Sequence, residues 1–254
     1  MNEAKNMKVV YEDERLIVVD KPSGLLTMST GRSGETTAYS ILYDYLSDRR
    51  QHGGRDGTHS IYIVHRLDRD TSGLLLFAKD QQTKLKLQEN WNEAVLERKY
   101  MAYLEGEIED QEGWIETWIY ENPVSMKVHC HPIDSRDIEA AREGQCRFAE
   151  RNGWQYASSH CRTVGVMEID GKTYTKVEFE LETGRKNQIR AHSEFIGHPI
   201  AGDRKYGASS NPFGRLALHA HKLSFIHPWN GKVMKFTSPL PATLRKGKSR
   251  QGLQ

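Results

Sequence analysis

IYIVHRLDRDTSGLLLFAKD, residues 61–80, is the stretch that decides the fold. Its two ends are short apolar runs, Ile61–Val64 and Leu74–Ala78, of the kind that is typical of buried β-strands. The residues between them, HRLDRDTS, are polar and crowded together. Such a turn has two explanations: its Asp and Thr side chains bond the backbone of a tight turn, or it carries a functional site. It is not a protein-kinase catalytic loop, because Leu67 separates the arginine from the aspartate.

Short apolar or alternating runs dominate the chain, and we predict strands at residues 8–11, 16–19, 61–64, 74–78, 99–104 and 115–120. Apolar residues three or four apart predict helices at residues 37–49, 81–92, 136–142 and 187–196. The dipeptides Asp170-Gly171 and Asn230-Gly231 each lie between two strand-like runs and favour two-residue hairpin turns. Residues 51–60 contain three glycines and no apolar residue, which predicts a mobile loop. The mixture predicts an α+β fold.

Composition narrows the class of protein. The 254 residues are 37% hydrophobic and 28% charged, which suits one large or two small globular domains. No apolar run approaches the roughly 20 residues of a membrane span, and the amino-terminal residues lack the apolar stretch of a secretion signal. The three cysteines are widely spaced and support neither a disulfide framework nor a Cys-x-x-Cys metal site. We therefore expect a cytoplasmic protein without a membrane partner.

Charge is unevenly distributed along the chain. Residues 1–184 carry 23 basic and 32 acidic side chains, whereas residues 185–254 carry 13 basic and 2 acidic ones. The concentrated positive charge suits a nucleic acid, since each neutralised phosphate releases counterions. A solvated basic tail at residues 245–254 is the alternative explanation for part of this charge. Residues 105–121 contain seven acids and no base, and we expect them to form a solvated edge away from any ligand.

Seven motifs extend the pattern over nearly the whole chain, from about Val9 to Leu244. They are KPSG (21–24), HRLDRDTSG (65–73), RKYMAYLEG (98–106), TGRKNQIRAH (183–192), GHPIAGDRKYG (197–207), RLALHA (215–220) and SPLP (238–241). Together, and in this order, they resemble the RluA family of RNA pseudouridine synthases.

The resemblance implies a fold and a reaction. The fold would be an extended, mostly antiparallel sheet with flanking helices and a central catalytic cleft. The enzyme would detach the base of a uridine in RNA and rejoin it through C5, with Asp68 as the catalytic carboxylate. A carboxylate can stabilise positive charge at C1′, bond to C1′, or remove a neighbouring proton, and the sequence leaves these three routes open.

The resemblance also assigns two residues around the aspartate. Arg190 matches the family arginine that pairs with the catalytic carboxylate, and a cation there would keep a buried carboxylate ionised. Tyr100 matches the active-site tyrosine, which is suited to stacking on the base and to the final proton removal at C5. Pattern alone favours a surface residue of an amphipathic helix for Arg190, whereas for Tyr100 a core aromatic of a strand fits equally well.

Two further arginines are assigned to the RNA. Arg66 matches the family position associated with flipping the nucleotide out and filling the vacated space. Arg185 lies where the family has an arginine near the substrate, with a structural ion pair as the alternative. Lys186-Asn187 departs from the family pattern, which usually has a threonine or similar residue and then a histidine. We expect activity to persist, because Asn187 still donates and accepts hydrogen bonds.

The resemblance implies a single catalytic domain over residues 1–254, without the separate amino-terminal RNA-binding domain of many relatives, followed by a basic tail at residues 245–254. The expected partner is ribosomal or transfer RNA, and the expected reaction needs no metal or other cofactor. We expect a monomer, because RNA can supply the second surface. Neither the RNA nor the modified uridine can be read from the sequence.

Two other functions fit parts of the pattern. A metal-dependent phosphodiesterase could draw ligands from His192, His198, Asp203, His219 and His221, although alternating histidines on a strand face opposite sides of a sheet. A protein of the same fold could also bind RNA as a folding chaperone without catalysis. Only turnover separates this second alternative from the enzyme.

Overall fold

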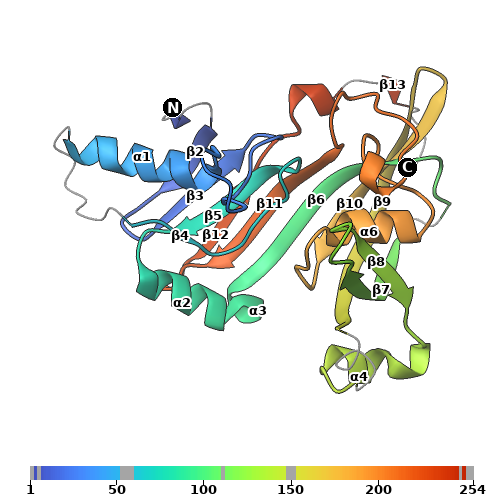
Figure 1. Cartoon of the computed structure of the whole chain (residues 1–254), viewed down its shortest axis with the longest axis horizontal. Coiled ribbons are helices and arrows are strands. Elements are labelled where there is room, and N and C mark those ends of the chain that lie inside the picture. The colour runs from blue at the N-terminus through green and yellow to red at the C-terminus, as the bar shows by residue number, and fades with distance from the viewer. Residues whose placement is uncertain are drawn as a thin grey trace. The chain divides into compact units, whose positions relative to one another are not determined.

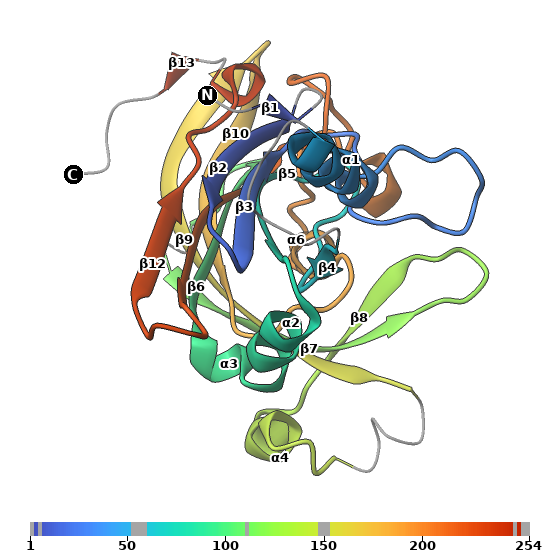
Figure 2. The same ribbon diagram turned by 90° about the vertical axis from the view of Figure 1, so that its left-hand side faces the viewer.

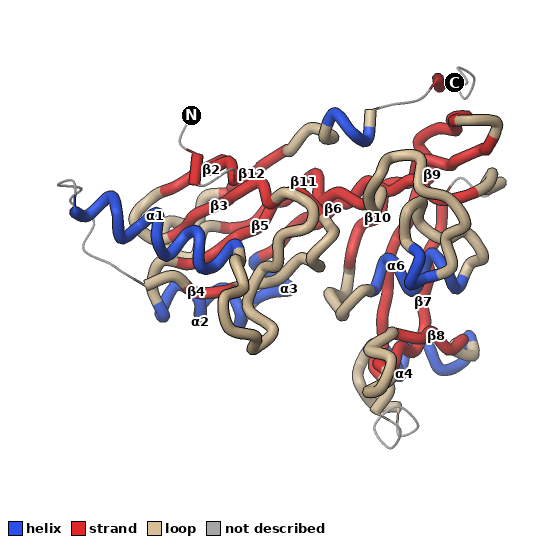
Figure 3. Tube along the Cα trace, turned by 45° about the horizontal axis from the view of Figure 1, so that its top comes forward, coloured by secondary structure: helices blue, strands red, loops and turns tan. Residues whose placement is uncertain are grey.

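The computed structural model describes residues 3–4, 7–51, 60–109, 112–146, 153–245 and 248–249. The predicted mobile loop at residues 51–60 and the basic tail at residues 245–254 lie mostly outside these ranges. The chain divides into two compact units, which we call unit 1 (residues 1–98 and 219–240) and unit 2 (residues 99–218 and 241–254). Strands dominate the secondary structure of both units, as the red segments of Figure 3 show.

Unit 1 is built around three neighbouring strands. β3 (Leu16–Lys21) pairs antiparallel with β2 (Met7–Glu12) on one side and with β5 (Ser72–Ala78) on the other, and Figure 2 shows the three side by side. β5 also pairs in parallel with β11 (Leu218–Ile226). The other elements of the unit are β1 (Glu3–Ala4), β4 (Tyr62–Ile63), β12 (Val233–Thr237), α1 (Ala38–Gln51), α2 (Gln81–Glu89) and α3 (Trp91–Ala94). β1 is labelled in Figure 2 and the others in Figure 1.

β5 forms the centre of the unit 1 core. All seven of its residues are buried, which explains why its sequence, SGLLLFA, lacks the polar alternation of a half-exposed strand. Alternate residues of β5 pack in one cluster with residues of β3 and β11: Leu74, Leu76, Ala78, Leu16, Val18, Leu223 and Phe225. The segment that precedes β5 is therefore attached to one of the most buried strands of the unit.

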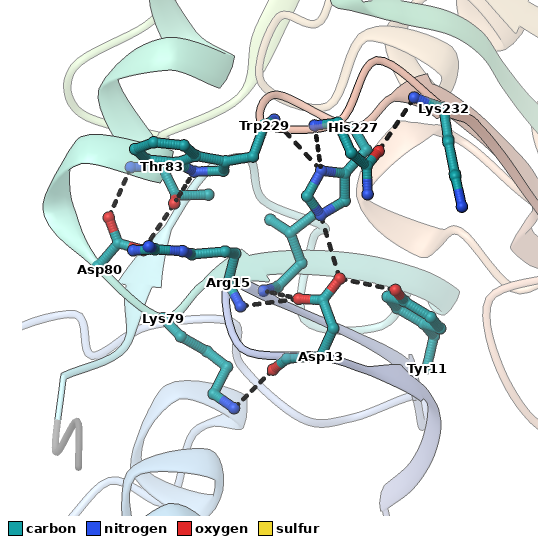
Figure 4. A network of polar contacts seen from close by, with 11 residues as sticks. Tyr11, Asp13, Arg15, Lys79, Asp80, Thr83, His227, Trp229 and Lys232 are labelled. Atoms are coloured by element: carbon teal, nitrogen blue, oxygen red, sulfur yellow. Dashed lines mark hydrogen bonds and ion pairs between the residues drawn. The ribbon is translucent and has the colours of Figure 1, made fainter. Parts of the chain in front are cut away.

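A polar network ties the β2–β3 turn to the loop between β11 and β12 (Figure 4). Asp13 accepts two backbone N–H groups of its own turn at 2.7 Å and the Tyr11 hydroxyl at 2.6 Å. The hydrogen bond to this carboxylate raises the pKa of Tyr11 to about 12. His227 lies with Nε2 3.1 Å from Asp13, while its Nδ1 accepts the backbone N–H of Trp229 at 3.2 Å. His227 is thereby fixed as a structural residue of these two loops.

Unit 2 holds its strands in the order β6, β10, β9, β7, β8, and each neighbouring pair is antiparallel. The strands are β6 (Val95–Glu105), β7 (Glu112–Glu121), β8 (Val128–Pro132), β9 (Gln155–Ile169), β10 (Lys172–Leu181) and β13 (Lys248–Ser249). The helices among the described residues of this unit are α4 (Ile138–Arg142), α6 (Gln188–Phe195), and the short 3-10 helices η1 (Ser135–Asp137), η2 (Arg204–Tyr206) and η3 (Ala242–Leu244). α6 packs against β7, β8 and β9.

The α+β class and the mostly antiparallel sheet pairing are confirmed, and each predicted strand and helix is present. The predicted helix at residues 81–92 is divided at Asn90 into α2 and α3. Asp170-Gly171 makes the predicted hairpin between β9 and β10, with φ angles of 51° and 73°. The prediction of a two-residue turn at Asn230-Gly231 is wrong, because the bond from His227 N–H to the Lys232 carbonyl closes a longer loop.

The acidic run at residues 105–121 is only partly the solvated edge that we expected. Glu105 accepts hydrogen bonds from the backbone N–H and hydroxyl groups of both Ser209 and Ser210. Glu116 accepts bonds from Arg142 and from the Tyr156 hydroxyl. These acids hold loops and a helix in place, which the count of charges could not reveal.

Candidate active site

The loop between β4 and β5 carries Arg66 and Asp68, and we call residues 64–71 the catalytic loop after the role predicted for Asp68. Arg66 is exposed and Asp68 is partly buried. The backbone N–H of Thr71 donates to the Asp68 carbonyl at 3.2 Å and closes a turn around the aspartate. The Thr71 hydroxyl is buried without a hydrogen-bond partner in the described part of the chain, an uncommon condition in folded proteins.

Residues 21–27 clamp this loop on both sides of Asp68. The Thr27 hydroxyl donates to the Leu67 carbonyl at 2.8 Å and accepts the Leu67 N–H at 3.2 Å. Lys21 is fully buried, and its ammonium donates to the Arg69 carbonyl at 3.0 Å and to two carbonyls of its own segment. Because the residues before and after Asp68 are both held, the backbone that carries the carboxylate has little freedom.

His65 attaches the start of the catalytic loop to β5. Its Nε2 accepts the backbone N–H of Leu76 at 3.0 Å, and its ring packs 5.4 Å from that of Trp91. Burial of the ring, followed by the positive charge of Arg98, lowers the pKa of His65 to about 3. The imidazole is therefore neutral near pH 7 and keeps an unprotonated nitrogen for the strand.

Arg190 lies on α6 in unit 2 and is held by a nearly buried carboxylate. Its Nε and Nη2 donate to the two oxygens of Asp203 at 2.6 and 2.8 Å, a bidentate pair. Its Nη1 donates to Asn187 at 3.1 Å, and its guanidinium carbon lies 4.7 Å from the centre of the Tyr206 ring. Asp68 belongs to unit 1, so its pairing with Arg190 stays a prediction.

Sequence reasoning missed these supports of Arg190. The sequence suggested only a metal-ligand role for Asp203 and no role for Tyr206. The one signal available was the GDRKYG motif, which contains both residues but says nothing of their partner. The pairing joins residues 13 positions apart across a loop, and only the tertiary structure brings them together.

Asn187 occupies the position where the chain departs from the family pattern. It precedes α6 in the left-handed conformation, with a φ of 52°, which asparagine tolerates better than most residues. Its side-chain oxygen accepts the hydrogen bond from Arg190. The asparagine thus supports the arginine directly, and the persistence of activity with this residue stays a prediction.

Tyr100 and Arg185 are the remaining predicted site residues, and both lie in unit 2. Tyr100 is buried in β6, opposite Phe179 of β10. Arg185 is exposed, its Nε donates to the Tyr156 carbonyl at 3.1 Å, and no ion pair to it is found among the described residues. Its backbone N–H donates to Gln188 at 3.0 Å, which fixes the chain just before α6. The structure thus groups Arg66 with Asp68 in one unit and the other three residues in the second.

The model of the RNA pseudouridylate synthase family matches residues 15–195 of this chain. The chain belongs to this family. It is therefore an RNA pseudouridine synthase, an isomerase, and the family that the motifs predicted is confirmed.

Relatives of this synthase are found in several bacteria. An uncharacterized RNA pseudouridine synthase of Bacillus subtilis is 34% identical over 94% of this chain and 70% of its own length. Another, from Synechocystis sp., is 33% identical over 94% of this chain and 67% of its own length. The ribosomal large subunit pseudouridine synthase D of Nitrosomonas europaea is 32% identical over 94% of this chain and 63% of its own length.

Solved structures agree on the fold of the synthase. Human RNA pseudouridylate synthase domain containing 4 superposes with a TM-score of 0.69 at 22% identity, covering 93% of this chain and 90% of that one. Human RNA pseudouridylate synthase domain containing 1 gives the same TM-score at 23% identity, covering 100% and 93%. The predicted pseudouridine synthase fold is thereby confirmed.

Two of the candidate metal ligands, His192 and His198, have partners within the protein. His192 is fully buried between the hydroxyls of Thr117 and Ser159, each 3.0 Å away, and burial lowers its pKa to about 4. His198 Nδ1 lies 2.8 Å from the carbonyl of Glu105. Within the described ranges, no group of three or more His, Cys, Asp or Glu side chains is arranged to hold a metal ion. No helix there is long and apolar enough to cross a membrane.

Proposed function

We propose that this synthase isomerises specific uridines of ribosomal or transfer RNA to pseudouridine, with Asp68 as the catalytic carboxylate. The observation that supports Asp68 is the catalytic loop itself: Thr27 fixes the backbone of Leu67, and Lys21 holds the carbonyl of Arg69. A carboxylate that acts at C1′ must be placed to within a fraction of an ångström, and such bracing provides that placement.

The reaction rearranges bonds within one nucleotide. The bond from C1′ to N1 breaks, the uracil turns, C5 bonds to C1′, the hydrogen on C5 leaves as a proton, and N1 takes up a proton. Nothing is oxidised or reduced, so the proposal requires no redox cofactor. In this proposal Asp68 acts at or beside C1′, Arg190 keeps the carboxylate ionised, and Tyr100 stacks on the base and takes part in the removal of the C5 proton.

The substrate uridine must leave its stack to reach the carboxylate. In our proposal Arg66, which is exposed two residues before Asp68, fills the vacated space with its planar guanidinium. Arg185, exposed before α6, contacts the RNA backbone. The protein acts as a monomer, without a metal, in the cytoplasm, where such RNA is made and folded.

The test is tritium release from RNA that carries C5-tritiated uridine and comes from cells lacking this gene. Wild-type protein is compared with Asp68→Asn and with Asp70→Asn, a matched control whose exposed carboxylate lies in the same turn. We expect release by the wild type and by Asp70→Asn, and none by Asp68→Asn. Fractionated ribosomal and transfer RNA identify the substrate class.

Two outcomes would change the proposal. Release by Asp68→Asn at the wild-type rate would mean that another group is the catalyst. No release by the wild type from either RNA fraction, with RNA binding intact, would favour the non-catalytic RNA-folding protein.

A further inference from the structure

A chain of buried hydrogen bonds lies behind the end of the catalytic loop. It starts at Ser72, the first residue of β5, whose hydroxyl lies 2.8 Å from Nδ1 of His219. His219 Nε2 lies 3.1 Å from the hydroxyl of Ser238, and that hydroxyl donates to Asp20 at 2.6 Å. Ser72, His219 and Ser238 are at most 2% exposed. All four residues belong to unit 1.

The partners fix the direction of every hydrogen in this chain. Ser238 gives its hydrogen to a carboxylate, so its oxygen accepts from His219. The Ser238 carbonyl, which can only accept, also lies 3.4 Å from Nε2. Nε2 of His219 therefore carries a hydrogen. A neutral imidazole with its hydrogen on Nε2 has an unprotonated Nδ1, which accepts the hydroxyl of Ser72.

The donating end of this chain, Ser72, adjoins the turn that holds Asp68. Ser72 follows Thr71 directly, and the N–H of Thr71 closes that turn on the Asp68 carbonyl. On the other side of Ser72, Gly73 approaches β11 so closely that an added Cβ would lie 2.1 Å from the Ala220 carbonyl oxygen. Backbone pairing with β11 and the bond to His219 thus act together on the first two residues of β5.

We propose that His219 is a positioning residue for catalysis: through Ser72 it holds the turn that carries Asp68. This inference rests on the proposed catalytic role of Asp68. In this proposal His219 does not contact the substrate. Its neutral, Nε2-protonated form presents a single acceptor to Ser72, which sets the Ser72 rotamer and, through the backbone, the orientation of the turn.

His227 provides a matched control. It is also a buried imidazole of unit 1, 4% exposed, and it follows the last residue of the strand on which His219 lies. Its ring bonds Asp13 and the backbone of the loop between β11 and β12, which are the contacts drawn in Figure 4. Replacing it removes buried hydrogen bonds of a similar kind, but from loops other than the catalytic loop.

The experiment compares kcat and KM for tritium release by wild type, His219→Gln, His219→Asn, Ser72→Ala and His227→Gln, together with thermal unfolding of each. Glutamine places its amide near Nε2 and removes the acceptor that His219 Nδ1 offers to Ser72, so we expect kcat to fall about 10- to 100-fold with KM within about twofold. Asparagine places an oxygen near Nδ1, and we expect it to restore most of kcat. His227→Gln should lose stability yet keep the wild-type kcat.

Three results would overturn the role of His219. They are equal kcat values for His219→Gln and His227→Gln, no recovery of kcat in His219→Asn, and an unchanged kcat in Ser72→Ala. Ser72→Ala is the mildest of these variants, so it serves as the test if the histidine variants do not fold. Nitrogen-15 NMR of the resting protein adds a test that needs no activity, because a hydrogen on Nδ1 instead of Nε2 would contradict the chain. No tritium release by the wild-type protein would instead contradict the proposed function.

Discussion

Arg190 shows how one side chain can be fixed before any substrate arrives. Its guanidinium donates two hydrogen bonds to Asp203 and one to Asn187, and it lies over the ring of Tyr206. An arginine held in this way cannot swing between rotamers, which a flexible lysine at this position could do. The arrangement therefore fixes the orientation of the guanidinium.

Asp203→Asn should therefore affect both stability and turnover. It leaves Arg190 as a mostly buried cation without its bidentate partner, and we expect the free energy of unfolding to fall by about 3 kcal/mol. Because the guanidinium also loses its orientation, kcat for tritium release should fall at least tenfold at temperatures where the protein is folded. Urea unfolding and single-turnover release measure the two effects.

Glu194→Gln is the control for Asp203→Asn. Glu194 lies on the same helix and pairs with Lys127, but both side chains are partly exposed, so its replacement should cost less than about 1 kcal/mol and leave kcat unchanged. Equal effects of the two substitutions would show that Asp203 has no special part in the site.

Strands, helices and turns could be predicted wherever their signals are local. Asp170-Gly171 supplies two positive φ angles within two residues, and Asp80 caps α2 by accepting the N–H of Thr83. Asn230-Gly231 misled because Pro228, which has no N–H, begins a loop of four residues between His227 and Lys232. Only Gly231 of that dipeptide has a positive φ. Such a dipeptide therefore predicts the position of a turn more reliably than the number of residues in that turn.

The contacts that build the site could not be predicted, because they join distant parts of the sequence. Lys21 reaches a carbonyl 48 residues away, and Ser72 reaches a histidine 147 residues away. Sequence identified KPSG, HRLDRDTSG and RLALHA as motifs only through their resemblance to a family. The structure gives each motif a physical reason: in all three, side chains or backbone groups brace the catalytic loop.

Gly73→Ala tests the closest of these contacts between elements. Gly73 has a φ of 116°, and a Cβ there would lie 2.1 Å from the Ala220 carbonyl oxygen, so β5 and β11 would have to separate. We expect a loss of more than about 4 kcal/mol in the free energy of unfolding, or no soluble folded protein. Gly113→Ala in β7 is the control, since nothing lies within 4 Å of its added Cβ and its φ is not positive. A variant at Gly73 as stable as that control would contradict the packing of β5 on β11.

At the scale of the whole molecule, two histidines with a lowered pKa, His65 and His192, make stability depend on pH. The pKa is lowered to about 3 for His65 and to about 4 for His192, whereas an unfolded histidine titrates near 6.5. Between these values the unfolded chain binds more protons than the folded one, so the stability from these groups is complete above about pH 6.5 and is lost as the pH falls. Each histidine should lower the free energy of unfolding by about 1.4 kcal/mol per pH unit between about pH 6.5 and its pKa in the folded protein.

Urea unfolding at several pH values between 7 and 4.5 measures this slope. Glutamine can accept the Leu76 N–H in place of His65 Nε2, so His65→Gln should flatten the pH dependence by about one proton. His131→Gln, at an exposed histidine, should leave the slope unchanged. An unchanged slope in His65→Gln would mean that His65 is not the neutral acceptor of β5.

The uneven charge of the chain leads to the last prediction, which concerns RNA binding. Positive charge is concentrated after Gly184, and Arg185 is an exposed member of that segment. If its guanidinium contacts a phosphate, Arg185→Ala should weaken RNA binding and reduce the slope of log K against log salt concentration by about 1. Arg136→Ala is the matched control, because Arg136 is 85% exposed, pairs with Asp134 and belongs to the net acidic part of the chain. Filter binding at salt concentrations from about 50 to about 300 mM distinguishes the two variants. Equal slopes for both variants would place Arg185 outside the RNA contact.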